Sequence, residues 1–221
     1  MSKFETRSDH ILSAALEVVS DGGFRNLQML SVAASAGLSV GAIYRYYASK
    51  ASLCAALVAK VSARELAVLQ AIAASEASAP LRLADGVKAF VRRALQNRQL
   101  AYAMIAEPVD EAVDAERLVW RGHISRVFEG IIAEGVADES LRDTPPDLAA
   151  SCVVGAFMEA LIGPLSPEKP AEGGWESYVE VISEFCLAAV LGRSEAPANL
   201  FPDEKNAPKH RLQNTQTERK T

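Results

Sequence analysis

The residues with the most distinctive types and spacing lie near the N-terminus. Residues 23–53 read GFRNLQMLSVAASAGLSVGAIYRYYASKASL, in which Ala36-Gly37-Leu38-Ser39 predicts a tight turn between two short helices. Such a turn places the second helix across the first, an arrangement that lets one helix enter a DNA major groove. Arg45 can pair with a guanine edge, and Tyr44 can reach a phosphate or a thymine methyl. The chemistry that this segment favours is recognition of double-stranded DNA.

Gly41 and Lys50 fit the same interpretation. Glycine inside a helix costs about 1 kcal/mol relative to alanine, and Gly41 is explained if a phosphate backbone must approach closely. Lys50 opens the next helix, where free backbone N–H groups attract an anion. A helix pair with one glycine also occurs in ordinary bundles, and the tyrosines at 44, 46 and 47 could all be core residues. Spacing and charge alone therefore leave DNA binding open.

Nothing in the sequence indicates a catalytic or metal centre. There is no glycine-rich phosphate loop, metal-ligand cluster or nucleophile elbow, so we expect no catalytic residues, no metal and no cofactor, and an enzyme is the weaker alternative. An odd number of distant cysteines fits free thiols in a reducing cytosol better than a disulfide framework or a zinc site. The histidines and cysteines are far apart: His10, His123, His210, Cys54, Cys152 and Cys186.

Composition and charge narrow the class of protein. The 221 residues are 49% hydrophobic, which excludes disorder of the whole chain. The formal charge is −5, yet the first 60 residues carry six basic and four acidic side chains. Only this N-terminal part is expected to meet a polyanion. No apolar stretch of 18 residues free of charge and no leader are apparent, so we expect no membrane contact and a cytoplasmic protein.

Every periodic stretch of the chain predicts a helix, so we expect an all-α fold with about nine helices. The first helix runs through Ile11–Val19, with Thr6 as its cap and Gly22-Gly23 at its end. The others are expected at about 28–35, 40–47, 50–74, 81–97, 99–106, 113–135, 146–161 and 174–191, with a proline-rich loop at 164–173. We assign residues 1–50 to a helix-turn-helix domain, 51–192 to a helical sensing and dimerisation domain, and 193–221 to a disordered tail.

The N-terminal segment resembles the DNA-binding domain of the tetracycline-repressor (TetR) family. The resemblance covers about 45 residues, in which the turn, the second helix and the following lysine occur together at the family's spacing. The rest of the chain is similar only in the number, length and order of its helices. The matching residues are Ile11-Leu12, Ala14-Ala15, Gly23-Phe24, Val32-Ala33, Ala36-Gly37-Leu38-Ser39, Gly41, Ile43-Tyr44, Tyr46-Tyr47, Lys50 and Leu53.

The resemblance implies a one-component transcriptional regulator, usually a repressor, that binds a palindromic operator as a homodimer and is released by a small-molecule effector. Leu27 and Gln28 stand where the family commonly has threonine or serine, and Val40 and Ala42 replace polar residues, which makes Arg45 the main candidate for reading bases. An interaction module without DNA binding, or an activator, remains an alternative. The DNA-binding residues that the resemblance implies are Gln28, Ser39, Val40, Gly41, Tyr44, Arg45, Tyr46 and Lys50.

The expected effector pocket lies between the helices of residues 81–135, its usual place in the family. Trp120 and His123 are one turn apart and could offer an apolar wall and a polar group to one cavity. Each candidate is alternatively a core residue. The acidic segment 107–116 is expected to be a solvated loop and helix start, with a cationic ligand or a metal as the alternative. The candidate lining residues are Phe90, Tyr102, Met104, Trp120, His123 and Phe128.

The helices at about 146–161 and 174–191 are apolar on more than one face. A two-fold four-helix interface would bury the excess apolar surface, so we expect the homodimer to form through these two helices. A large core within one chain is the alternative. The residues on which this expectation depends are Ala149, Ala150, Val153, Val154, Ala156, Phe157, Val179, Ile182, Phe185 and Ala188.

Overall fold

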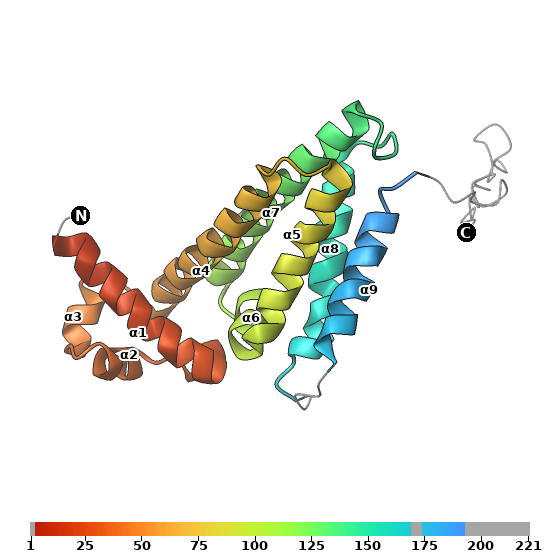
Figure 1. The fold of residues 1–221 in the computed structure, drawn as a ribbon. Helices are drawn as coiled ribbons and strands as arrows, with labels where there is room; N and C mark the ends of the chain where they lie inside the picture. Colours follow the sequence, from red (N-terminus) through yellow and green to blue (C-terminus); the bar gives the residue numbers. More distant parts are fainter. Residues whose placement is uncertain (1–2, 169–173, 193–221) are drawn as a thin grey trace, which may run out of the picture.

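A computed structural model describes residues 3–168 and 174–192, with side chains from residue 5 onward. Within these residues the chain forms nine α-helices and no strand, which confirms the all-α prediction. The first three helices form a compact head at one end of the molecule (Figure 1). They are α1 (Lys3–Asn26), α2 (Met29–Ser35) and α3 (Val40–Tyr44). The tail predicted at 193–221 lies outside the described residues.

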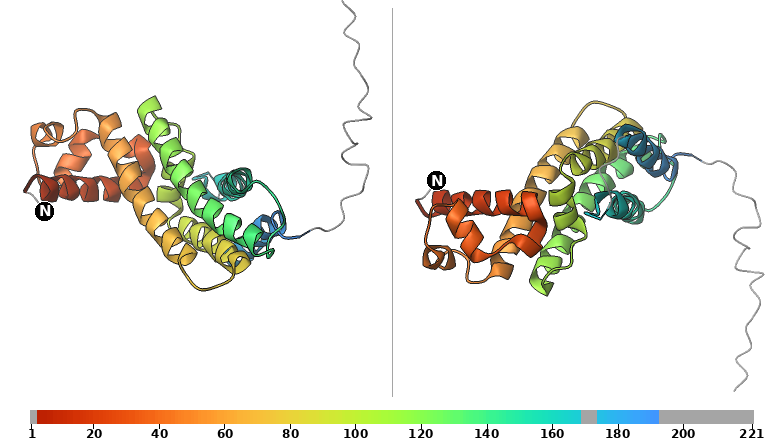
Figure 2. Two further views of the ribbon diagram at one scale, coloured as in Figure 1. Left: turned by 90° about the horizontal axis from the view of Figure 1, so that it is seen from above. Right: turned by 90° about the horizontal axis from the view of Figure 1, so that it is seen from below.

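The remaining helices form the body. The long helices α4 and α7 run side by side, α7 also packs on α8, and α5 packs on α9 (Figures 1 and 2). The short helix α6 contacts α1 and α8, so it lies between the head and the body. The body helices are α4 (Lys50–Ala73), α5 (Ala79–Gln96), α6 (Arg98–Ile105), α7 (Glu111–Ala137), α8 (Pro146–Leu165) and α9 (Trp175–Ala188).

Local capping explains where the helices of the head begin. Ser39 Oγ accepts the N–H of Ala42 at 3.2 Å, as expected for the N-cap of α3. Ser49 and Ser52 form a reciprocal capping box at the start of α4, with both bonds at 3.0 Å. Gln28 precedes α2 without a side-chain cap bond, in agreement with the weak cap that its residue type predicts.

Two separate hydrophobic cores hold the fold. The head core buries Ile11, Leu27 and Ile43 completely, and it extends into α4. The body core is built around three phenylalanines, Phe90, Phe128 and Phe157, with ring centroids 4.9 Å apart for Phe90 and Phe157 and 5.7 Å for Phe128 and Phe157. Aromatic pairs at these separations add to the stability that burial provides.

Two predicted boundaries of the first and third helices are wrong. Thr6 lies inside α1 and does not cap it, because the helix begins at Lys3. The regular part of α1 does break at Gly23, as Gly22-Gly23 predicted, with φ 73° and ψ −176°, and the chain then continues as helix to Asn26. α3 ends at Tyr44, whereas the pattern predicted about Tyr47; its C-cap is Arg45.

The predicted end of the eighth helix is also wrong, because α8 continues through Pro164 to Leu165. A proline inside a helix leaves the carbonyl four residues earlier without its usual N–H donor. Here the Tyr178 hydroxyl donates to the Ala160 carbonyl at 2.7 Å, and Arg98 Nε donates to the Pro164 carbonyl at 2.9 Å. The Tyr178 hydroxyl thus replaces the lost backbone bond, and Arg98 binds a carbonyl at the end of the helix, so α8 continues past the proline.

α8 is long and apolar enough to span a membrane by length and composition alone, with a mean hydropathy of 1.8. It packs against α5, α6, α7 and α9. Central core helices have the same composition, so this property by itself is weak support for a membrane span.

Candidate functional site

The outer surface of α3 carries most of the residues predicted to bind DNA. Ile43 and Tyr47 point inward and are buried, as their spacing predicts, and Tyr47 Oη lies 2.7 Å from Ser8 Oγ. On the other side Tyr44 is 49% exposed, and a side chain at Gly41 would meet no atom within 4 Å. Arg45 is also exposed. An exposed tyrosine and arginine beside an open glycine form a surface that can lie close to another backbone.

The other predicted DNA-binding residues lie around this surface. Gln28, Ser39 and Lys50 are exposed at the starts of α2, α3 and α4. Val40 is half-buried in the first turn of α3. Tyr46 is half-buried and packs against the head core, so it is less open to a ligand than Tyr44. The three helix starts and α3 therefore supply one mostly polar surface of the head.

The first acidic residue of segment 107–116 corrects the expectation of a solvated segment. Glu107 is only 5% exposed and accepts hydrogen bonds from the backbone N–H groups of Phe24 and Arg25. Sequence periodicity could not reveal this, because the partner lies 83 residues away in the head. The residues that follow behave as expected: Asp110 caps α7, and Glu111 and Asp114 are exposed in its first turn.

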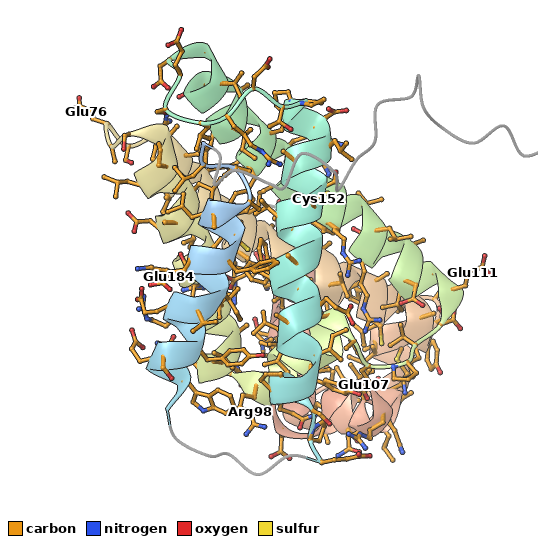
Figure 3. The ribbon with its side chains drawn as sticks, turned by 90° about the vertical axis from the view of Figure 1, so that its right-hand side faces the viewer. Glu76, Arg98, Glu107, Glu111, Cys152 and Glu184 are labelled. Atoms are coloured by element: carbon orange, nitrogen blue, oxygen red, sulfur yellow. The ribbon has the colours of Figure 1, made fainter. Side chains whose placement is uncertain are left out.

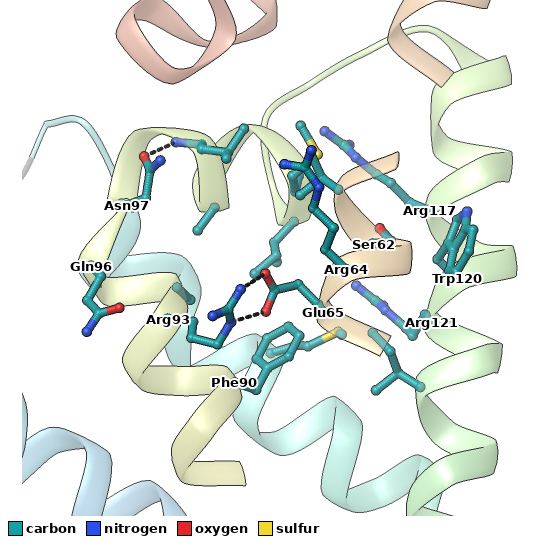
Figure 4. A pocket seen from close by; sticks show the side chains of 18 of the residues that line it. Ser62, Arg64, Glu65, Phe90, Arg93, Gln96, Asn97, Arg117, Trp120 and Arg121 are labelled. Carbon is teal, nitrogen blue, oxygen red and sulfur yellow. Dashed lines mark hydrogen bonds and ion pairs between the residues drawn. The ribbon is translucent and has the colours of Figure 1, made fainter. Parts of the chain in front are cut away.

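A cavity of about 400 Å³ lies between α4, α5, α6 and α7 (Figure 4). Of the predicted lining residues, Phe90, Met104 and Trp120 line it, together with Ile124 and Met158. The wall also includes Leu16 and Ser20 of α1, so the cavity touches the head. A volume of this size, with an apolar wall and a few polar groups, is typical of a small-molecule site.

The structure does not place the other three predicted lining residues in this cavity. Phe128 is fully buried in the body core. His123 stacks on Trp120 with ring centroids 5.1 Å apart and accepts a hydrogen bond from Arg126 at 3.2 Å. Tyr102 is half-buried beside the body core. The one-turn spacing correctly predicted that His123 lies next to Trp120. It could not show which side of the helix faces the cavity, so the prediction that His123 lines it is wrong.

Four arginines around the cavity were missed by the sequence analysis. Arg93 forms a two-bond ion pair with Glu65, at 2.7 and 2.8 Å. Burial lowers the pKa of the Arg117 guanidinium, although arginine remains charged at any physiological pH. Arg64 and Arg121 are exposed, and no ion pair within the described residues engages them. The cavity therefore combines an apolar interior with positive charge around it (Figure 4).

The outer sides of α8 and α9 form an uncovered apolar surface, here called the α8–α9 face, which includes Leu148, Val181 and Phe185. These residues are 60%, 62% and 67% exposed. The two helices lie side by side on one flank of the body, and Cys152 marks the face on α8 (Figure 3). Most of the residues on which the dimer prediction depended are instead packed in the core of one chain; they are Ala149, Ala150, Val153, Val154, Phe157, Val179 and Ile182.

Two of the three thiols are buried, and one is exposed. Burial raises the pKa of Cys54 and of Cys186 to about 11, which keeps both protonated and unreactive. Cys152 is exposed on the α8–α9 face. No group of three or more metal-binding side chains is found in the parts of the chain that the structure covers.

Comparison with known proteins relates the head to one family. The profile of bacterial regulatory proteins of the tetR family matches residues 11–57, which cover most of the head and the start of α4. The HTH-type transcriptional repressor KstR of Mycolicibacterium smegmatis is 27% identical over 135 residues, or 60% of this chain. The alignment spans 64% of the length of that relative.

Solved structures match nearly the whole described fold. The regulator FadR from Bacillus subtilis, solved in complex with stearoyl-CoA, has a TM-score of 0.70 at 17% identity and covers 82% of this chain and 98% of its own. The fatty acid degradation regulator FadR from Bacillus halodurans has a TM-score of 0.69 at 16% identity, covering 81% and 97%. At these identities the likeness shows the arrangement of helices in head and body alike, and nothing of the ligand.

Proposed function

We propose that this chain, whose residues 11–57 match the profile of bacterial regulatory proteins of the tetR family, is a cytoplasmic transcriptional repressor that binds a palindromic operator as a homodimer. The observation that carries the proposal is the outer surface of α3, where Gly41, Tyr44 and Arg45 are exposed above a closed core. A helix presented in this way can enter a major groove with its side chains toward the base edges.

Each exposed group of the head has a distinct role in this proposal. Arg45 reads a base, because its guanidinium can make two parallel hydrogen bonds to guanine. Gly41 lets the DNA backbone approach the helix, and Tyr44 contacts a phosphate or a thymine methyl. Gln28 and Lys50 contact phosphates from the starts of α2 and α4.

The α8–α9 face joins two copies of the chain in this proposal. Leu148, Val181 and Phe185 are large apolar side chains exposed on one flank, where monomeric proteins rarely leave a contiguous patch uncovered. Small residues between them, including Gly155, would let helices of the second copy approach. A two-fold dimer would present two α3 helices to major grooves about 34–36 Å apart.

The cavity would bind an amphipathic anion that relieves repression. Its inner wall is apolar, with Phe90, Ile124 and Met158, which suits an alkyl chain. Arg64 and Arg121 are exposed around it, which suits a phosphate or carboxylate. A fatty acyl-CoA has both parts, and the similar fold of FadR was solved with stearoyl-CoA. We therefore propose long-chain acyl thioesters of coenzyme A as the effector class.

The DNA-binding part is tested by selecting duplexes from a random pool with the purified full chain. We expect a palindrome to be enriched, with an affinity that falls steeply with salt because phosphate contacts release counterions. Lack of any enriched sequence in the absence of effector would contradict the proposal of a repressor.

The effector part is tested by titrating the complex of protein and selected operator with stearoyl-CoA. We expect release of the operator, whereas free coenzyme A, which lacks the alkyl chain, should have little effect. A 100-fold decrease in operator affinity requires a coupling free energy of about 2.7 kcal/mol between the effector site and the DNA-binding site, which is within the usual range for allostery. Equal effects of the two compounds would argue against an alkyl-binding cavity.

A further inference from the structure

Besides the apolar contacts between the head and the body, one buried carboxylate of the body binds the backbone of the head. Glu107, just after α6, accepts the N–H of Phe24 on Oε2 at 2.8 Å and the N–H of Arg25 on Oε1 at 2.9 Å. The Arg25 guanidinium lies 3.8 Å from Oε1. Hydrogen bonds to an ionised acceptor are among the strong ones, and a buried carboxylate without partners is costly. We call this arrangement, formed by Glu107 with the N–H groups of Phe24 and Arg25, the Glu107 clasp.

The backbone of the head has a special shape at the clasp. Gly23 has φ 73° and ψ −176°, a region that essentially only glycine occupies. A Cβ atom at this position would lie 2.5 Å from Glu107 Oε2, so a side chain there would displace the carboxylate. The break in α1 occurs directly before the two N–H groups that Glu107 binds. The glycine-specific backbone conformation and the long-range contact therefore belong to one feature.

Arg117 places the same feature next to the cavity. This residue lines the cavity, and its guanidinium donates to the Ala103 carbonyl in α6 and to Asp114 at 2.8 Å. Its Cζ atom lies 5.9 Å from the centre of the Phe24 ring. One side chain thus contacts the ligand cavity, the helix that leads to Glu107, and the first residue that Glu107 holds.

We propose that Glu107 is a positioning residue, which fixes the orientation of the DNA-binding head on the body, and that Arg117 connects this clasp to the cavity. The expected effect of the clasp on DNA binding, which is to set the spacing of two heads on an operator, rests on the proposed function. A molecule in the cavity that moves Arg117 or α6 would loosen the clasp and let the head turn. The clasp acts on orientation, because Glu107 itself is buried and binds the backbone of the head.

The clasp is tested first without DNA, by amide hydrogen exchange of the full chain. Exchange at Phe24 and Arg25 should rise by about tenfold or more in E107Q, since the neutral amide offers one acceptor oxygen in place of two. E111Q is the matched control, because Glu111 is an exposed glutamate nearby that loses the same charge. Unchanged exchange in E107Q, or a rise spread evenly over head and body, would overturn the proposal.

The link to the cavity is tested by the same measurement on R117K. Lysine keeps the charge but loses the planar group that reaches both Ala103 and Phe24. Exchange at Phe24 and Arg25 should rise by roughly threefold or more, whereas R126K, an exposed position on the same helix, should behave as the wild type. If R117K matches R126K, Arg117 does not connect the clasp to the cavity.

The consequence for DNA is tested on operators whose half-sites are moved apart by one base pair. Wild type and E111Q should bind the altered operator much more weakly than the original. In E107Q the ratio of the affinities for the original and the altered operator should be at least about fivefold smaller than in the wild type. An unchanged spacing preference in E107Q would contradict a positioning role. Failure of the wild type to bind any palindrome would instead contradict the proposed function, and the exchange experiments would still decide the clasp.

Discussion

Among the described residues, the head exposes one large aliphatic side chain, Leu30 of α2, whereas the body exposes several large apolar side chains, three of them on the α8–α9 face. The head core is formed by α1, α2, α3 and the start of α4, together with Ala103 and Val113 of the body. The surface of the head that is proposed to bind DNA is formed by polar residues and a glycine on α3. The body buries a larger core and still leaves Leu148, Val181 and Phe185 exposed on one flank. The head therefore fits a surface that meets a polar ligand, and the body fits a surface that meets another protein surface.

The strongest way to break this comparison is to make the α8–α9 face polar. In F185E a charge would enter the centre of the proposed interface, where an unpaired buried charge is very unfavourable. We expect a monomer by ultracentrifugation and an operator affinity lower by about 100-fold or more, corresponding to about 2.7 kcal/mol. The helical content should not change.

Leu118 provides the matched control for that change. It is 65% exposed on α7, almost as much as Phe185, but it lies outside the α8–α9 face. L118E should leave the dimer intact. If both variants dissociate equally, or neither does, the distinction between the two exposed apolar sites is wrong.

The next effect is expected on the head. R45A removes the main candidate for a base contact and should weaken operator binding by about 1–3 kcal/mol, with relaxed preference at one base pair of each half-site. Binding of selected and altered duplexes by fluorescence anisotropy measures both. Arg126, an exposed arginine of the body, supplies R126A as a control that should bind like the wild type. A uniform loss over all sequences would place Arg45 on a phosphate.

Thiol labelling compares the stability of the two cores in one experiment. Cys54 belongs to the head core and Cys186 to the body core, and both are buried with a pKa raised to about 11. At pH 8 Cys54 and Cys186 should react only after local opening of the chain around them. We expect Cys54 to react about tenfold faster than Cys186, because the head core is smaller. Mass spectrometry of tryptic peptides over time distinguishes the thiols.

The same thiols predict the direction of a pH effect on stability. A folded pKa of about 11 exceeds the ordinary value of 9.0, so the unfolded chain loses these protons first as the pH rises. The free energy of unfolding should therefore fall as the pH rises from about 9 toward 11. Serine at both positions should remove this part of the dependence; a slope that persists in C54S/C186S would come from other groups.

The smallest expected effect concerns the open glycine of α3. G41A should stabilise the protein by up to about 1 kcal/mol, because alanine favours a helix and the added methyl meets no neighbour. Operator binding should nevertheless weaken by several-fold if DNA approaches this position. Gly130 of α7 has the same open surroundings, so G130A should stabilise equally without affecting DNA binding. Denaturant titration and anisotropy separate the two results.

Local signals in the sequence were sufficient to predict where most helices lie and which sides of α3 are buried and exposed. Ser39 and Ser49 cap the two helices expected from about residues 40 and 50, and Ile43 and Tyr47, four residues apart, share the buried side of this segment. These properties depend on neighbours within one turn of helix, which the sequence shows directly.

Features that depend on residues far apart in the chain could not be predicted. The end of α8 was missed because Tyr178 supplies the bond that Pro164 removes. His123 and Phe128 were assigned to the cavity because spacing shows which residues share a side of a helix, but not what lies opposite. Glu107 looked like one of several surface acids, and only its contact with the head distinguishes it.

The head core includes residues of the body, and this limits how the head could be transferred to another protein. Ala103 of α6 and Val113 of α7 are buried in the head core, alongside Leu53 and Leu57 of α4. A transplant of residues 1–50 onto an unrelated sensor would therefore expose part of that core and remove the carboxylate at Gly23. To change the DNA specificity of such a protein, substituting the exposed residues of α3 should therefore be easier than replacing the whole head.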